Sequence, residues 1–174
     1  DISNPASLRI ADSIRVDTDS EIKIRNNNLY FVSIDENSEP HLVIVDITQR
    51  ENPIVRLTMG ISGYCYTIFE DKLYVASQMK SPPLLDVYSL SGEYPVLETS
   101  FPINTEAKEI FCADNLLFVN TAWMSLVEIY DLESDSFPLI YSTEQIYIKD
   151  LISCNGKLII TDDSIGLSLI EASK

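Results

Sequence analysis

The chain has 174 residues, of which 45% are hydrophobic and 22% are charged, a composition typical of a folded domain with a buried core. The net charge is −15 with only 12 scattered basic residues. This argues against binding to nucleic acid or to an anionic membrane, because phosphates must be neutralised by clustered lysine and arginine. No apolar run approaches the ~18 residues that a membrane-spanning helix needs, so no membrane insertion is expected.

Short strands follow one another along the whole chain. The segments are rich in β-branched and aromatic residues, and none holds the 3.6-residue apolar period of a helix. Between them lie turns of Asn, Asp and Gly, which tolerate the positive φ of tight hairpins. In chain order the predicted strands are Leu8–Ile14, Leu29–Val32, His41–Ile47, Ile54–Met59, Tyr64–Phe69, Leu73–Ser77, Leu85–Leu90, Leu116–Val119, Val127–Leu132, Leu158–Thr161 and Leu167–Ala172.

The strands belong to an internal repeat of about 43 residues. One recurring string, which reads Leu42-Val43-Ile44-Val45-Asp46 in the first copy, is called the phrase. Its last residue is Asp46, Ser89, Asp131 or Glu171, in steps of 43, 42 and 40 residues. A second phrase keeps nearly the same period, and so does a proline a few residues past the first phrase. Their markers are Leu29, Leu73, Leu116 and Leu158, and Pro5, Pro53, Pro95 and Pro138. Three markers in one period indicate a true structural repeat.

Four strands in 40–45 residues is the size of a β-propeller blade. The sequence therefore predicts an all-β fold, a single propeller domain over residues 1–174 with four four-stranded antiparallel blades. The last unit lacks an outer strand, which the segment Leu8–Ile14 supplies if the ring closes on itself. Because the chain begins at Asp1 in the middle of a phrase, it is expected to be a mature or trimmed segment. A closed four-bladed ring and half of a larger ring both remain open.

The phrase Leu42-Val43-Ile44-Val45-Asp46 resembles the LVIVD-repeat family, which is named for this string. Leu73–Ala76 and Gly166–Ile170 echo the rest of that family's pattern, and Asp1–Pro5 matches the end of its phrase. In the second and third copies Asp86 and Glu128 replace apolar residues. The resemblance implies a propeller of a cell-surface or secreted protein, and it implies no shared catalytic residues.

The candidate catalytic and metal-binding motifs of the sequence are incomplete. His41 is the one histidine and is interpreted as a loop residue, so no Ser-His-Asp triad is expected. The acidic segments 17–21 and 35–39 lack the Gly of a calcium-binding EF-hand loop. Five glycines form no phosphate-binding loop, so no cofactor is expected. Cys112 and Cys154 occupy matching strand positions and are interpreted as small hydrophobic residues, not as a disulfide.

The most variable segments are the loops between the second and third strands of each unit. Two of them carry large apolar groups, at Met79 and at Trp123 and Met124. Trp123 is either a contact residue for a partner or a plug that folds back on its own loop. Variable loops on a rigid frame are where binding normally resides. The predicted binding residues are Trp123, Met124, Met79, Tyr64, Asp162 and Asp163.

Three functions follow from these patterns. The leading hypothesis is a non-enzymatic interaction or scaffold propeller, extracellular or in the cell envelope, that binds a protein or a carbohydrate through one face. The second is a propeller hydrolase or lyase with acidic residues around the central channel. The third is a structural half-propeller that assembles into a larger ring.

Overall fold

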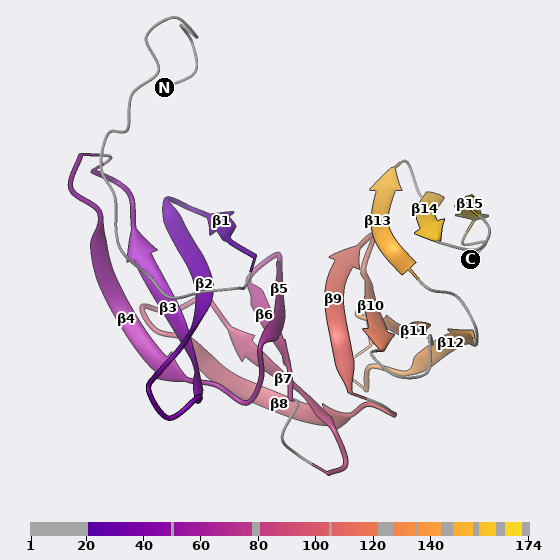
Figure 1. Ribbon diagram of the computed structural model, residues 1–174, viewed down its shortest axis with the longest axis horizontal. Coiled ribbons are helices and arrows are strands. Elements are labelled where there is room, and N and C mark those ends of the chain that lie inside the picture. The colour runs from indigo at the N-terminus through magenta and orange to yellow at the C-terminus, as the bar shows by residue number, and fades with distance from the viewer. Residues whose placement is uncertain are drawn as a thin grey trace, which may run out of the picture. The chain divides into compact units, whose positions relative to one another are not determined.

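The computed structural model describes residues 21–49, 51–77, 81–104, 106–121, 127–134, 136–143, 148–154, 157–162 and 166–171, and from residue 143 onward it describes the backbone only. All of the regular elements in these ranges are β-strands, and each pairs antiparallel with a neighbour in the sequence (Figure 1). None of the described segments forms a helix with the length and apolarity that crossing a bilayer requires. The chain divides into two compact units, Asp1–Ile61 and Ser62–Lys174.

The first unit contains one four-stranded sheet in the order β1-β2-β3-β4. Its central strands pair over their whole length, from Asn28 opposite Asp46 to Ile34 opposite Pro40. Alternation along these strands buries Phe31 together with Val43 and Val45 on one face. The strands are β1 (Lys23–Arg25), β2 (Asn28–Ile34), β3 (Pro40–Asp46) and β4 (Ile54–Gly60).

The second unit contains three sheets, of four, four and three strands. The first comprises β5 (Cys65–Phe69), β6 (Lys72–Ala76), β7 (Leu84–Ser89) and β8 (Val96–Pro102). The next comprises β9 (Ala107–Ala113), β10 (Leu116–Thr121), β11 (Val127–Asp131) and β12 (Leu139–Thr143). The last comprises β13 (Ile148–Cys154), β14 (Lys157–Asp162) and β15 (Gly166–Glu171). In each sheet the strands lie side by side in chain order.

The sequence repeat reappears in the details of the backbone. The third and fourth strands of three sheets change register at one equivalent place, between Ile44 and Val45, Val87 and Tyr88, and Ile129 and Tyr130. The same three sheets share a hydrogen bond from the residue after the phrase to the hairpin turn. Its donors and acceptors are Ile47 N to Asn27 O (2.8 Å), Leu90 N to Asp71 O (2.6 Å) and Leu132 N to Asn115 O (2.9 Å).

The acidic end of the repeated phrase has a local structural role. The carboxylate of Asp46 accepts the amide of Thr48 at 2.8 Å, and Asp131 accepts the amide of Glu133 at 2.9 Å. Hydrogen bonds from the Thr48 side chain and amide lower the pKa of Asp46. In the second copy the hydroxyl of Ser89 replaces the carboxylate, with a longer distance of 3.3 Å to the amide of Ser91. The repeated residue therefore holds the turn that ends the third strand.

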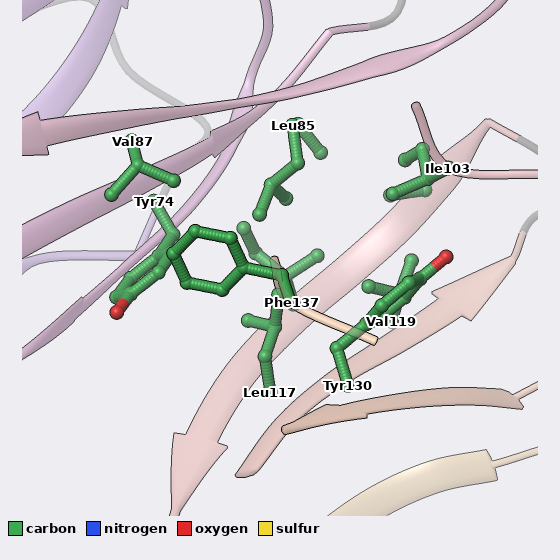
Figure 2. Packing of buried hydrophobic residues seen from close by; sticks show 11 residues of the cluster. Tyr74, Leu85, Val87, Ile103, Leu117, Val119, Tyr130 and Phe137 are labelled. Atoms are coloured by element: carbon green, nitrogen blue, oxygen red, sulfur yellow. The ribbon is translucent and has the colours of Figure 1, made fainter. Parts of the chain in front are cut away.

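The largest apolar cluster lies between the β5–β8 sheet and the β9–β12 sheet. Leu85 and Val87 from the first of these sheets face Leu117 and Val119 from the second (Figure 2). The ring of Phe137 stacks on Phe101 with a centroid distance of 4.8 Å and an interplanar angle of 9°. Burying a side chain of this size stabilises the fold by about 1.5–3 kcal/mol. This packing of consecutive sheets is the arrangement that the repeat predicts.

The structure confirms the all-β class and most of the strand predictions. The Asn and Asp turns adopt positive φ as expected, for example 60° at Asn27 and 61° at Asn115. The predicted strand Ile54–Met59 is β4 and pairs with β3, so the strand that follows the phrase is the fourth strand of the same sheet. Four four-stranded blades were expected, whereas the last described sheet has three strands. The segment Leu8–Ile14 lies outside the described residues, so ring closure and the single domain stay predictions.

Candidate functional site

The strand register brings the variable loops and the linkers between sheets to one end of each sheet. In the β5–β8 sheet, Cys65 pairs with Ala76, Ala76 with Leu85, and Leu85 with Phe101. Cys65 begins β5 and Ala76 ends β6, whereas Leu85 is the second residue of β7 and Phe101 lies next to the end of β8. The linker that enters β5 and the loop between β6 and β7 therefore share one end, which we call the linker end.

The other sheet of this core has the same arrangement. Ala107 in β9 pairs with Thr121 in β10, and Val127 in β11 pairs with Thr143 in β12. The loop between β10 and β11 thus starts and finishes at the linker end of its sheet. Trp123 and Met124 belong to that loop and lie outside the described residues.

The remaining predicted binding residues stand as follows. Tyr64 lies in the linker that enters β5 and is half-buried. Asp162 is the last residue of β14 and pairs with Gly166 and Ile148, which places its backbone at the linker end of the last sheet. Met79 and Asp163 lie outside the described residues. The binding roles of all six residues stay predictions.

A buried carboxylate lies beneath the linker end of the β5–β8 sheet. Asp86 in β7 is only 2% exposed. The hydroxyl of Ser62, in the linker before β5, donates to Asp86 Oδ2 at 2.5 Å. The hydroxyl of Ser100 in β8 donates to Asp86 Oδ1, also at 2.5 Å. Both carboxylate oxygens therefore accept hydrogen bonds from hydroxyl groups of the same sheet and its linker, as a buried charge requires.

A second buried carboxylate occupies the equivalent place in the β9–β12 sheet. Glu128 in β11 has no exposed surface. The side-chain amide of Asn104, in the linker before β9, donates to Glu128 Oε1 at 2.5 Å. The hydroxyl of Tyr130 donates to Glu128 Oε2 at 2.7 Å. Burial raises the pKa of Tyr130, and its hydrogen bond to Glu128 raises that pKa further, so the phenol remains a donor at physiological pH.

The linker before β5 is also pressed closely against its sheet. A Cβ atom added to Gly63 would lie 1.8 Å from the carbonyl oxygen of Ala76, at the end of β6. Ala76 and the adjacent Ser77 are fully buried. Only glycine permits this approach of one backbone to another. Sequence reasoning missed Ser62, Gly63 and their contacts, although it marked Asp86 and Glu128 as departures from the phrase.

The other candidate groups have local roles. The interpretation of His41 as a loop residue is wrong, because it is the second residue of β3, pairs with Ser33 and Gly60 and is half-buried. Its Nδ1 donates to the carbonyl of Glu39 at 3.0 Å. The carboxylate of Asp35 accepts the amides of Asn37 and Glu39, and the latter bond is the main cause of its lowered pKa. The thiol of Cys65 donates to the carbonyl of Lys108 at 2.9 Å. Among the described residues, no three His, Cys, Asp or Glu side chains are grouped as a metal site would require.

Neither family models nor curated proteins match the chain, so the resemblance to the LVIVD-repeat family stays a prediction. Solved structures do match. One is BamB from Moraxella catarrhalis, with a TM-score of 0.60 and 14% identity over 87% of this chain and 42% of that one. Another is Hsv2p from Kluyveromyces lactis, with a TM-score of 0.63 and 12% identity over 91% of this chain and 50% of that one. Both are β-propeller proteins. The chain spans about half the length of these structures, and at such identities the likeness shows the fold alone: consecutive antiparallel sheets of the β-propeller type.

Proposed function

We propose that the chain is a non-enzymatic interaction module that binds a protein or carbohydrate partner through the loops at its linker ends. The observation that carries this proposal is the contrast between a regular frame and loops that vary in sequence and length. The described strands repeat their register, bulges and turn contacts from sheet to sheet. The segments between second and third strands range from three to seven residues, over positions 35–39, 77–83, 122–126 and 163–165. Such loops on a rigid frame are the usual place for recognition.

The burial and the hydrogen bonds of the two carboxylates support a non-enzymatic role. A general acid or base must reach a substrate with a carboxylate oxygen. In Asp86 and Glu128, each oxygen already accepts a hydrogen bond from within the protein, and neither side chain is accessible. The hydrolase alternative gains no support from these two residues. The cell-surface or secreted location belongs to the same proposal.

A partner-capture experiment tests the proposal. The immobilised chain would be exposed to an extract of the source cells' surface proteins and glycans, and retained molecules would be identified by mass spectrometry. We expect that replacing Trp123, Met124 and Met79 by alanine removes a specific set of retained molecules. The control is Tyr94→Ala, since this tyrosine is exposed in the turn between β7 and β8, at the opposite end of its sheet. Equal retention by both variants would contradict the proposal.

A second candidate is a half-propeller that assembles into a larger ring. One observation favours it: the chain spans about half the length of the matched propellers. Light scattering distinguishes the two, because assembly gives a multiple of the 19.6 kDa chain mass and a monomer does not.

A further inference from the structure

Two hydrogen bonds between linker and sheet follow the same rule in consecutive sheets. Ser62 precedes Asp86 by 24 residues, and Asn104 precedes Glu128 by 24 residues. The donor lies in the linker that enters the sheet, and the acceptor is the buried carboxylate of the third strand. The two pairs are one repeat length of 42 residues apart, although their residue types differ. The short side chain of Ser62 donates to the shorter acid, Asp86, and the longer side chain of Asn104 donates to the longer acid, Glu128.

One of the three sheets forms with an apolar residue at the position of these carboxylates. Val43 occupies the equivalent position in the first sheet, opposite Phe31 in β2, and is 7% exposed. An apolar side chain is therefore compatible with this place in the fold. Burying a carboxylate involves a large desolvation penalty, which good hydrogen bonds offset but rarely exceed. A stabilising role for Asp86 and Glu128 in the sheets themselves is thus a poor explanation of their presence.

We infer that Asp86 and Glu128 are positioning residues, each of which fixes the linker entering its own sheet in one conformation. Without the carboxylate, the side chain of Ser62 or Asn104 would have no fixed acceptor beneath the linker end and would turn toward water. The linker would keep its covalent path and lose its defined conformation. This inference concerns the order of the linkers whether or not a partner binds there, so it goes beyond the proposed function.

The contacts around each linker agree with this role. In the linker before β9, the amide of Ile103 donates to the carbonyl of Pro83 at 3.0 Å, and the amide of Asn104 lies 3.4 Å from Glu128 Oε2. One contact joins the linker to the sheet that it leaves, and the next joins it to the sheet that it enters. In the linker before β5, Gly63 follows Ser62 directly and lies against Ala76. Each linker is therefore fixed at successive residues.

Hydrogen–deuterium exchange of the full chain, read by mass spectrometry, tests the inference. The variants are Asp86→Val, which copies the first sheet, and Glu128→Leu. We expect Asp86→Val to speed exchange in residues 61–65 by about tenfold or more while residues 103–107 remain unchanged. Glu128→Leu should give the reciprocal result. The urea midpoint of Asp86→Val should stay near that of the unmodified chain, because the exposed hydroxyl of Ser100 can turn to water. Glu128→Leu should lower the midpoint, since the buried hydroxyl of Tyr130 loses its acceptor.

Two further variants keep the test decisive if a core substitution prevents folding. Ser62→Ala and Asn104→Ala change only linker side chains and leave the carboxylates in place, and each should loosen its own linker alone. Ser91→Ala, a hydroxyl at the opposite end of the β5–β8 sheet, is the control and should leave both linkers unchanged. The inference is overturned if the folded variants exchange like the unmodified chain, or if each substitution loosens both linkers and the strands equally.

Discussion

Gly63 is the described glycine at which an added methyl group has the least room, and Gly63→Ala is our most specific prediction. The new Cβ would lie 1.8 Å from the carbonyl oxygen of Ala76, 2.8 Å from its carbonyl carbon and 3.1 Å from Cα of Ser77. All three atoms belong to the backbone, so no side-chain rotation can relieve the overlap. The linker or the end of β6 must therefore move by more than about 1 Å to restore a normal contact distance between these atoms.

The size of the effect follows from two contributions. Overpacking a close-packed interior costs about 1–3 kcal/mol, and more where backbone must shift. Moving the linker also withdraws Ser62 from Asp86, and leaving a buried acceptor without its donor costs a further 1–3 kcal/mol or so. We therefore expect Gly63→Ala to lower the free energy of unfolding by about 3 kcal/mol or more. For a chain of this length that corresponds to a fall in Tm of roughly 10 °C.

Urea denaturation followed by tyrosine and tryptophan fluorescence measures this change. The matched control is Gly60→Ala, because a Cβ at Gly60 meets no atom within 4 Å. That substitution should be neutral or should stabilise the chain by up to about 1 kcal/mol, since alanine restricts the unfolded chain more than glycine does. The reasoning is wrong if the urea midpoints of the two alanine variants coincide.

Three further predictions test the core, the tyrosines and the turn. Leu117→Ala, in the apolar cluster between two sheets, should lower the free energy of unfolding by about 2–5 kcal/mol in urea denaturation. Leu97→Ala, at an exposed position of β8, should change that free energy by less than about 1 kcal/mol. Burial raises the pKa of Tyr74, so its phenol favours the folded chain below the ordinary tyrosine pKa of about 10, and that stability is lost as the pH rises further. The loss of stability between pH 9 and pH 11 should be smaller in Tyr74→Phe, and an identical pH dependence would contradict this. Ser89→Asp should raise the urea midpoint slightly. A carboxylate there would accept the amide of Ser91 and would lie opposite Lys72 on the neighbouring strand. A lower midpoint would contradict the role of the acid that ends the phrase.

Much of the fold was predictable because its determinants are local. Alternating apolar residues specify strands, and the turn residues Asn27 and Asn115 tolerate the positive φ that tight hairpins need. The repeated acid at Asp46 and Asp131 accepts an amide two residues ahead, a contact that depends on a few residues of sequence. Each of these features requires only neighbouring positions, so a period in the sequence becomes a period in the structure.

The candidate site was less predictable because its contacts are not local. The bond between Ser62 and Asp86 joins residues that become neighbours only after the linker has turned into β5 and the strands have paired. Nothing in the type of Ser62 indicates this partner. The departures at Asp86 and Glu128 were visible as polar residues within an apolar phrase, but they weakened a resemblance and were assigned no role. The two pairs are recognised as equivalent by their shared separation of 24 residues between donor and acceptor.

One buried position of the third strand holds a different residue in each of three sheets, namely Val43, Asp86 and Glu128. Three sheets keep the same backbone register at this position while its side chain changes from apolar to acidic. The register does not change with the side chain, and each acid accepts one hydrogen bond from its own sheet and one from the linker that enters it. In a repeat protein, the residues that violate the repeat at buried positions therefore identify where one unit is joined to the next.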